Sequence, residues 1–241
     1  MTITQDSNIN RVNLRGLLVY PFSEPSDLID FADSRKGILI AINAEKIVNA
    51  SRTPKSRDII NANIGYCDGA GAVMAARQKG AVCEKIAGCE LWLKIIERHH
   101  ASRSFYIIGA TPEVHKNTIE KLYQQYPDIN IVGHRDGYLR TPEERQALID
   151  DVAEKRPDFV FVAMGSPAQE DLMSEMLAKH TAVYQGLGGS FDVYTGKVER
   201  APKWWLEHNL EFAYRLIRQP KRIKRNLKYF TFAWWLLLKK F

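Results

Sequence analysis

Short apolar segments rich in β-branched residues alternate with segments of helical length along most of this chain. The predicted strands are residues 16–20, 37–43, 64–67, 104–109, 129–133, 158–164 and 182–186. The predicted helices between them include residues 90–100, 112–126, 142–155 and 167–180. Nearly continuous apolar strands that alternate with helices are typical of parallel sheets covered on both faces. The sequence therefore predicts an α/β fold with a mostly parallel, Rossmann-like sheet flanked by helices.

Two of the predicted helices begin with the pattern of a capping box, in which two side chains three residues apart bond each other's backbone amides. The two boxes pair Thr141 with Glu144 and Ser166 with Gln169, each with Pro at the first helical position. We therefore expect the Gln169 side chain to bond the backbone at Ser166, at the start of its own helix, besides any role in binding.

Polar residues and glycines follow four of the predicted strands. Sheets of this kind bind ligands at the carboxyl ends of their strands, and glycine loops at helix N-termini bind phosphate through free N–H groups. Plainer roles stay open, since Asn43 could cap a helix and Asp68 could belong to a simple turn. The features together favour a phosphate-bearing ligand and one candidate carboxylate. The candidates at the four strand ends are Asn43, Glu45, Asp68, Gly165, Gln169, Glu170, Gly188, Gly189 and Asp192.

Several classes of protein are excluded or disfavoured by what the sequence lacks. It has no Walker A motif, no G-x-G-x-x-G and no D-x-D pair, so an ATPase, a dinucleotide enzyme and an aspartate-held divalent ion are not supported. Its six His and three Cys do not cluster, and we predict neither a metal nor a cofactor. The odd number of cysteines and the polar, signal-free start favour a reduced, cytoplasmic protein.

Positive charge gathers in the C-terminal part of the chain. Residues 197–241 hold twelve Lys or Arg and three Glu, a balance of +9, whereas the whole chain carries +6. A mildly acidic body with a strongly basic end indicates a polyanionic partner, for which nucleic acid and an anionic membrane surface both qualify. We expect two parts, an α/β catalytic domain over residues 1–200 and a helical appendage over residues 201–241.

The appendage is predicted to contain two helices separated by Pro220. The first has an apolar stripe of Leu206, Leu210, Ala213 and Ile217, and the second has one of Ile223, Leu227, Phe230 and Trp234. The final apolar run, residues 229–238, would reach about 15 Å as a helix, half of the roughly 30 Å needed to span a membrane. Such a helix could simply pack on the domain with its Lys and Arg face in water. Since basic residues lie beside the apolar run, we expect instead a helix that rests on an anionic membrane surface.

A series of motifs in a fixed order resembles the WecG/TagA/CpsF family of bacterial glycosyltransferases, over residues 15–227. They are AINAEK at 41–46, DG at 68–69, VAMGSP at 162–167 with QE at 169–170, and GLGGSFD at 186–192. Further matches are RAP at 200–202, residues 211–215, QP at 219–220 and Arg222.

The resemblance is strongest to the enterobacterial branch of that family. It implies a hexosyltransferase that moves N-acetylmannosaminuronic acid from its UDP donor to undecaprenyl-diphosphate-linked GlcNAc, in enterobacterial common antigen synthesis. The implied reaction inverts the anomeric centre without a metal or cofactor. The implied location is peripheral, on the cytoplasmic face of the inner membrane, with a homo-oligomer left open.

The resemblance also implies roles for individual residues. Asp68 matches the proposed general base, and Asn43 with Glu45 matches the donor-pocket motif. Gln169 and Glu170 match a second pocket motif, and the ends of the remaining strands, Gly109 among them, are expected to contact substrate. Related wall-teichoic-acid enzymes have Thr where this chain has Ala41, so no hydroxyl contact is expected there. The arginines expected to close over the diphosphate are Arg215, Arg222 and Arg225, and Arg200 of the RAP motif is expected to contact substrate.

Three alternatives remain open at this stage. A transferase of the same family could use UDP-N-acetylmannosamine or another UDP-sugar. A nucleic-acid-binding protein could use the basic end, although its aromatic residues form one run and are not interleaved with the charges as stacking platforms. A membrane adaptor could retain the fold without activity. Replacing Asp68 separates the last two from an enzyme, because only an enzyme should lose turnover while keeping its fold.

Overall fold

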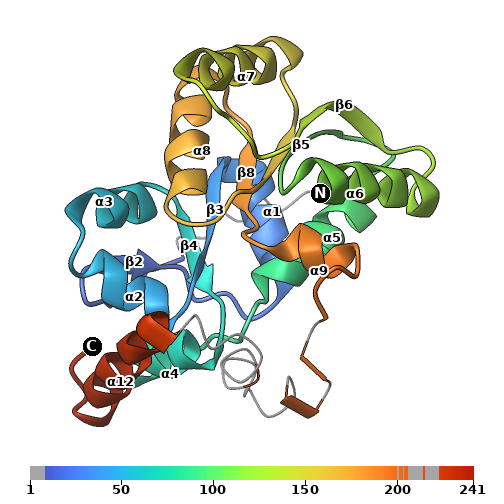
Figure 1. Ribbon diagram of the computed structural model, residues 1–241. Helices are drawn as coiled ribbons and strands as arrows, with labels where there is room; N and C mark the ends of the chain where they lie inside the picture. The colour runs from blue at the N-terminus through green and yellow to red at the C-terminus, as the bar shows by residue number, and fades with distance from the viewer. Residues whose placement is uncertain (1–8, 200, 203, 206–213, 215–222) are drawn as a thin grey trace, which may run out of the picture.

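The computed structural model describes residues 9–199, 201–202, 204–205, 214 and 223–241. Its centre is a six-stranded parallel sheet in the order β4-β3-β8-β7-β5-β6 (Figure 1). The mostly parallel α/β sheet predicted from the sequence is confirmed. The strands are β3 (Gly37–Ile42), β4 (Ile64–Cys67), β5 (Ser104–Gly109), β6 (Asn130–Arg135), β7 (Phe159–Ala163) and β8 (Val183–Gly186).

The first predicted strand, residues 16–20, has a different place. Its central part is β2 (Leu17–Val19), which pairs antiparallel with β1 (Val12–Leu14) in a separate two-stranded sheet. Arg15 and Gly16 both have positive φ, at 55° and 90°, and this reverses the chain tightly between the two strands. Only Tyr20 reaches the main sheet, where its N–H donates to the Gly65 carbonyl at 2.8 Å.

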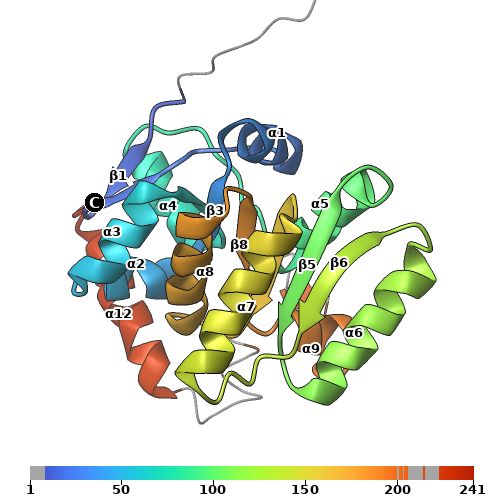
Figure 2. The same ribbon diagram turned by 90° about the horizontal axis from the view of Figure 1, so that it is seen from above.

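Helices cover both faces of the sheet (Figure 2). The strand side chains alternate between two apolar clusters, so Ile38 and Ile40 of β3 belong to one and Leu39 to the other. The first cluster includes side chains of α2 (Ala44–Ala50), α4 (Ala70–Gln78), α7 (Pro142–Lys155) and α8 (Ala168–Lys179). The second includes side chains of α1 (Pro25–Arg35), α5 (Gly88–His99), α6 (Pro112–Gln125) and α9 (Ser190–Tyr194). The remaining helix of this region, α3 (Pro54–Ala62), contributes Ile60 to the first cluster.

The two predicted capping boxes differ in outcome. At α7 the Thr141 hydroxyl accepts from the Glu144 N–H at 3.2 Å, while the Glu144 carboxylate accepts from Arg140 N–H at 2.8 Å, one residue before the cap. At α8 the predicted box is wrong. The helix begins at Ala168 after Pro167, so Ser166 is not its cap, and no side chain caps this end.

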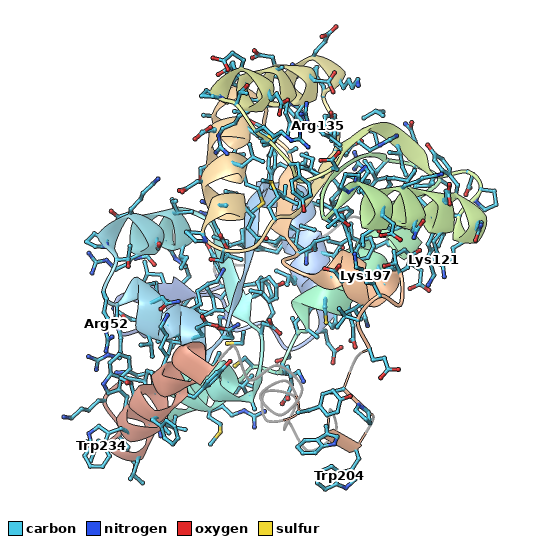
Figure 3. All side chains as sticks on the ribbon, viewed as in Figure 1. Arg52, Lys121, Arg135, Lys197, Trp204 and Trp234 are labelled. Atoms are coloured by element: carbon cyan, nitrogen blue, oxygen red, sulfur yellow. The ribbon has the colours of Figure 1, made fainter. Side chains whose placement is uncertain are left out.

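The C-terminal helix α12 (Ile223–Leu237) packs beside α2. Its Phe232 is 4% exposed, and the ring lies so close to Gly71 that a Cβ there would come within 2.9 Å of it. The helix therefore contacts the body through the side that carries Phe232, whereas Phe230 and Trp234 of the predicted apolar stripe are 74% and 59% exposed. Trp234 projects away from the body of the molecule (Figure 3). The preceding stripe from Leu206 to Ile217 lies outside the described residues.

No helix among the described residues combines the length and the hydrophobicity needed to cross a membrane.

The close approach of β5 and β7 at Gly109, which pairs with Ala163, leads to a first prediction. Gly109 has φ +123°, and a Cβ there would lie 2.4 Å from the Ala163 carbonyl oxygen. The variant Gly109→Ala should lower the free energy of unfolding by about 3 kcal/mol or more in urea denaturation, from strain and overlap together. Gly196→Ala is the matched control, because Gly196 has φ +79° with no atom within 4 Å of a Cβ. It should cost only about 1–2 kcal/mol, and equal losses would show that the close approach is unimportant.

Candidate active site

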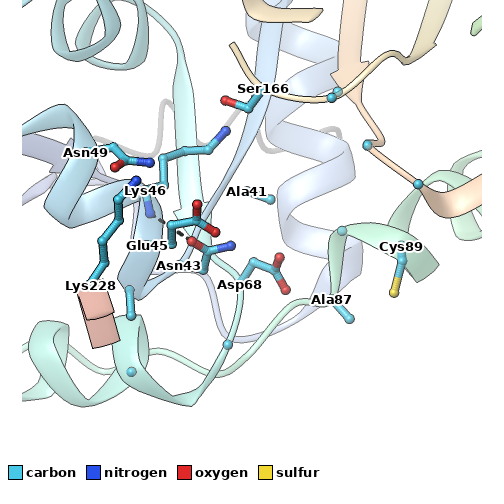
Figure 4. Close-up of a pocket in the computed structure, with 18 of the residues that line it drawn as sticks. Ala41, Asn43, Glu45, Lys46, Asn49, Asp68, Ala87, Cys89, Ser166 and Lys228 are labelled. Carbon is cyan, nitrogen blue, oxygen red and sulfur yellow. Dashed lines mark hydrogen bonds between the residues drawn. The ribbon is translucent and has the colours of Figure 1, made fainter. Parts of the chain in front are cut away.

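A cavity of about 1600 Å³ lies at the carboxyl ends of β3, β4, β7 and β8, next to α12. Most of the residues predicted from the strand ends line it, and Figure 4 shows several of them pointing into the same space. The predicted residues that line the cavity are Asn43, Glu45, Asp68, Gly165, Gln169, Glu170, Gly188, Gly189 and Asp192.

Asp68 stands directly after the last residue of β4. Its N–H donates to the Ile42 carbonyl at 2.8 Å, which extends the pairing with β3 by one residue and fixes the backbone. The next residue, Gly69, has φ +106°, a conformation that glycine adopts without strain, and α4 follows at once. This short, well-held turn presents a carboxylate to the cavity.

Two neighbours of Asp68 on β4 remain protonated at neutral pH. Burial, followed by the charges of Asp68 and Cys89, raises the pKa of the Tyr66 phenol well above its ordinary value. Burial and the adjacent Cys83 likewise raise the pKa of the Cys67 thiol. Neither group can supply an anion for base or nucleophilic chemistry there. A carboxylate needs no such activation, so Asp68 is the candidate base of this strand end.

Asn43 has the plainer role that the sequence left open. It is the N-cap of α2, and its side-chain oxygen accepts from the Lys46 N–H at 2.9 Å. Because it also lines the cavity, capping holds its amide at the cavity wall. The capping prediction is confirmed, and contact with a ligand stays a prediction.

Gln169 connects two glycine turns instead of capping α8. Its side-chain oxygen accepts from the Gly165 N–H at 3.1 Å and from the Gly188 N–H at 3.0 Å. A Cβ on Gly186 would lie 2.3 Å from the Gln169 amide nitrogen, so only glycine leaves room for this side chain. The turns after β7 and β8 are therefore held together by one buried amide.

Cations that the sequence did not single out also line the cavity. Lys46 forms an ion pair with Glu170 at 2.6 Å, and the two side chains are 17% and 9% exposed. Lys85 precedes α5, and Lys228 reaches the cavity from α12. Lys46 lies within the motif at 41–46, which was its only signal, whereas Lys228 could be placed only by the packing of a distant helix.

Five predicted site residues are not placed in the cavity. Gly109 does not line it and faces the Ala163 backbone, so a role for Gly109 in substrate binding stays a prediction. Arg200, Arg215 and Arg222 lie outside the described residues, as does the side chain of Arg225 on α12.

Across the described residues, no three His, Cys, Asp or Glu side chains come together closely enough to hold an ion. The groups available to a ligand are thus the carboxylates, the lysines and the glycine turns at the strand ends.

The bridging amide generates a second prediction. Gln169→Met keeps the approximate size of the side chain but leaves the N–H groups of Gly165 and Gly188 without their acceptor. The free energy of unfolding should fall by about 1–3 kcal/mol, and hydrogen exchange of these two amides should accelerate. Gln146→Met is the control, because Gln146 bonds Asp150 on the exposed side of α7. If the two variants lose the same small amount of free energy of unfolding, the Gln169 amide does not hold the turns after β7 and β8 together.

The comparison with known protein families agrees with this geometry. A model of the family described as glycosyl transferase WecG/TagA/CpsF matches residues 18–241, nearly the whole chain. The match includes every strand of the main sheet, the residues that line the cavity and α12. The chain therefore belongs to the WecG/TagA/CpsF family of glycosyltransferases, enzymes that transfer a sugar from a donor to an acceptor.

Proposed function

We propose that the protein transfers N-acetylmannosaminuronic acid from its UDP donor to undecaprenyl-diphosphate-linked GlcNAc, with inversion at the anomeric carbon. The observation that carries this proposal is the position of Asp68, a carboxylate on a rigid strand end inside the large cavity of a family glycosyltransferase. The resemblance to the enterobacterial branch supports the choice of donor and acceptor.

In the proposed reaction Asp68 accepts the proton of the acceptor hydroxyl as its oxygen attacks the anomeric carbon. The bond from that carbon to the UDP oxygen breaks on the opposite face, so one displacement inverts the configuration. Negative charge develops on the diphosphate and needs cations nearby. Lys85 and Lys228 line the cavity and are suited to this task. Arg200, Arg215, Arg222 and Arg225 are proposed to add to them.

One observation favours a second donor. Lys46 forms an ion pair with Glu170 inside the cavity, so the charge of this cation is already balanced. A balanced pair suits a neutral sugar better than a uronic carboxylate, which would normally be met by an unbalanced cation. UDP-N-acetylmannosamine is therefore the alternative donor within the same reaction.

The outer face of α12 supports a location at the membrane. Phe230, Trp234 and Leu237 are exposed on this helix, and the exposed Lys239 and Lys240 follow it. Aromatic and aliphatic side chains beside lysines are typical of helices that lie in the interface of an anionic membrane. We propose that residues 201–241 dock the enzyme on the inner face of the cytoplasmic membrane, where its lipid acceptor resides.

The proposed chemistry predicts the effect of Asp68→Asn. Single-turnover transfer from UDP-N-acetylmannosaminuronic acid to a short-chain polyprenyl-diphosphate-GlcNAc, in excess EDTA, should fall at least about a hundredfold, since a general base contributes that much. UDP-N-acetylmannosamine is assayed in parallel. The control is Asp58→Asn, because the Asp58 side chain is 75% exposed on α3. Equal rates for wild type and Asp68→Asn would remove Asp68 from its role.

The proposal that α12 docks on the membrane predicts a variant that loses vesicle binding. The double variant Trp234→Glu, Leu237→Glu places two charges on the outer face of α12, away from the cavity, and should abolish flotation with vesicles that contain anionic phosphatidylglycerol. Turnover of a water-soluble, short-chain acceptor should change little. Tyr123→Glu serves as the control, because Tyr123 is 43% exposed on α6. Undiminished flotation of the double variant would contradict docking through α12.

A further inference from the structure

The ion pair of Lys46 and Glu170 joins two elements across the cavity. Lys46 comes from α2, directly after β3, and Glu170 comes from the first turn of α8, directly after β7. Their charged atoms lie 2.6 Å apart, and both side chains line the cavity. Figure 4 shows the Lys46 side chain extended through the cavity towards Ser166.

Stability alone does not explain this pair. Removing two charges from water costs about as much as their attraction returns, so buried ion pairs add little to the folded state. Glu170 Oε2 is moreover buried and makes no hydrogen bond with any described residue. An acceptor left in this state is destabilising unless something else satisfies it. A molecule bound in the cavity can supply this donor.

The chemistry of the pair selects the kind of group it would bind. The Lys46 ammonium offers N–H donors, and its hydrogen-bond partner among the described residues is Glu170. Glu170 cancels its charge and would repel a second anion placed beside it. A hydroxyl group meets both needs, because its oxygen accepts from Lys46 and its proton can be donated to Glu170. The carboxylate turns easily about its last torsion, so either of its oxygens can face the cavity.

We infer that Lys46 and Glu170 form a subsite for neighbouring hydroxyl groups of the nucleotide sugar, and not for its diphosphate or for a sugar carboxylate. The inference rests on the proposed function in so far as the ligand is a UDP-sugar. The hydroxyls belong either to the ribose or to the transferred sugar. In both cases the pair acts as a binding and specificity element, separate from the base Asp68.

Binding measurements test the subsite, with UDP, UDP-N-acetylmannosamine and UDP-N-acetylmannosaminuronic acid as probes in calorimetry. Lys46→Met should weaken binding of at least one probe about tenfold or more. Glu170→Gln should weaken it as well, because the hydroxyl loses a charged acceptor. If binding of all three probes weakens equally, the pair binds the ribose hydroxyls. If binding of only the two UDP-sugars weakens, the pair binds hydroxyls of the transferred sugar.

Whether Glu170→Gln weakens or tightens binding distinguishes a hydroxyl subsite from a site for the diphosphate or for the uronic carboxylate. If Lys46 binds the diphosphate or the uronic carboxylate, removing the neighbouring negative charge should tighten binding, and that result would overturn the inference. Unchanged binding in Lys46→Met would overturn it too. The double variant Lys46→Met, Glu170→Gln leaves no unpaired charge. It should weaken binding no more than Lys46→Met alone does, because the two residues act together.

A matched control excludes a general effect on α8. Glu175 on the same helix pairs with Arg145 at 2.8 Å and does not line the cavity, so Glu175→Gln should bind all probes as the wild type does. Thermal unfolding of each variant confirms that it is folded. Since the readout is binding, failure of the protein to transfer sugar with these donors would count against the proposed function alone.

Discussion

The pairing of β8 with both β3 and β7 is the constraint on which the site depends. β8 is the last strand among the described residues, yet it lies in the middle of the sheet, between β7, which precedes it in the chain, and β3, which is the first strand of the sheet. Because all six strands run parallel, their carboxyl ends open on one edge of the sheet. The turn after β8 therefore comes beside the turns after β3 and β7, and the carboxylate that follows β4 lies next to them. Without this strand order, Asp68 and Gln169 would share no cavity.

Polar contacts between these turns then give the cavity a defined wall. Gln169 holds the turns after β7 and β8 together, and the pair of Lys46 with Glu170 joins the elements after β3 and β7. Such contacts are strong where water is scarce, and they orient the groups that take part in them. Three of the strand ends are thus coupled by side chains, and at the fourth the backbone of Asp68 is held by its pairing with β3.

The helix α12 relates the cavity to the outer surface. Its inner face contributes the buried Phe232 and the cavity residue Lys228, whereas Trp234 and Leu237 face outwards. A single rigid helix therefore contacts both the site of chemistry and the surface proposed to meet the membrane. In that arrangement a lipid-linked acceptor would approach along the same helix that helps to line the cavity.

The sequence by itself determined the six parallel strands, most of the helices and the strand-end positions of Asn43, Asp68 and Gln169, because hydrophobic periodicity and turn residues act locally. Only the tertiary structure decided that residues 16–20 join a hairpin, that Gln169 bonds two glycine turns, and that Lys46 meets Glu170. It also decided which face of α12 is buried, since both faces are apolar in sequence. The hairpin and the Gln169 bridge are local, but they depend on positive-φ turns at residues such as Arg15, Gly165 and Gly188, which hydrophobic periodicity does not specify. The ion pair joins residues 124 positions apart and the buried face of α12 depends on α2, and a pattern of neighbouring residues carries no record of such distant partners.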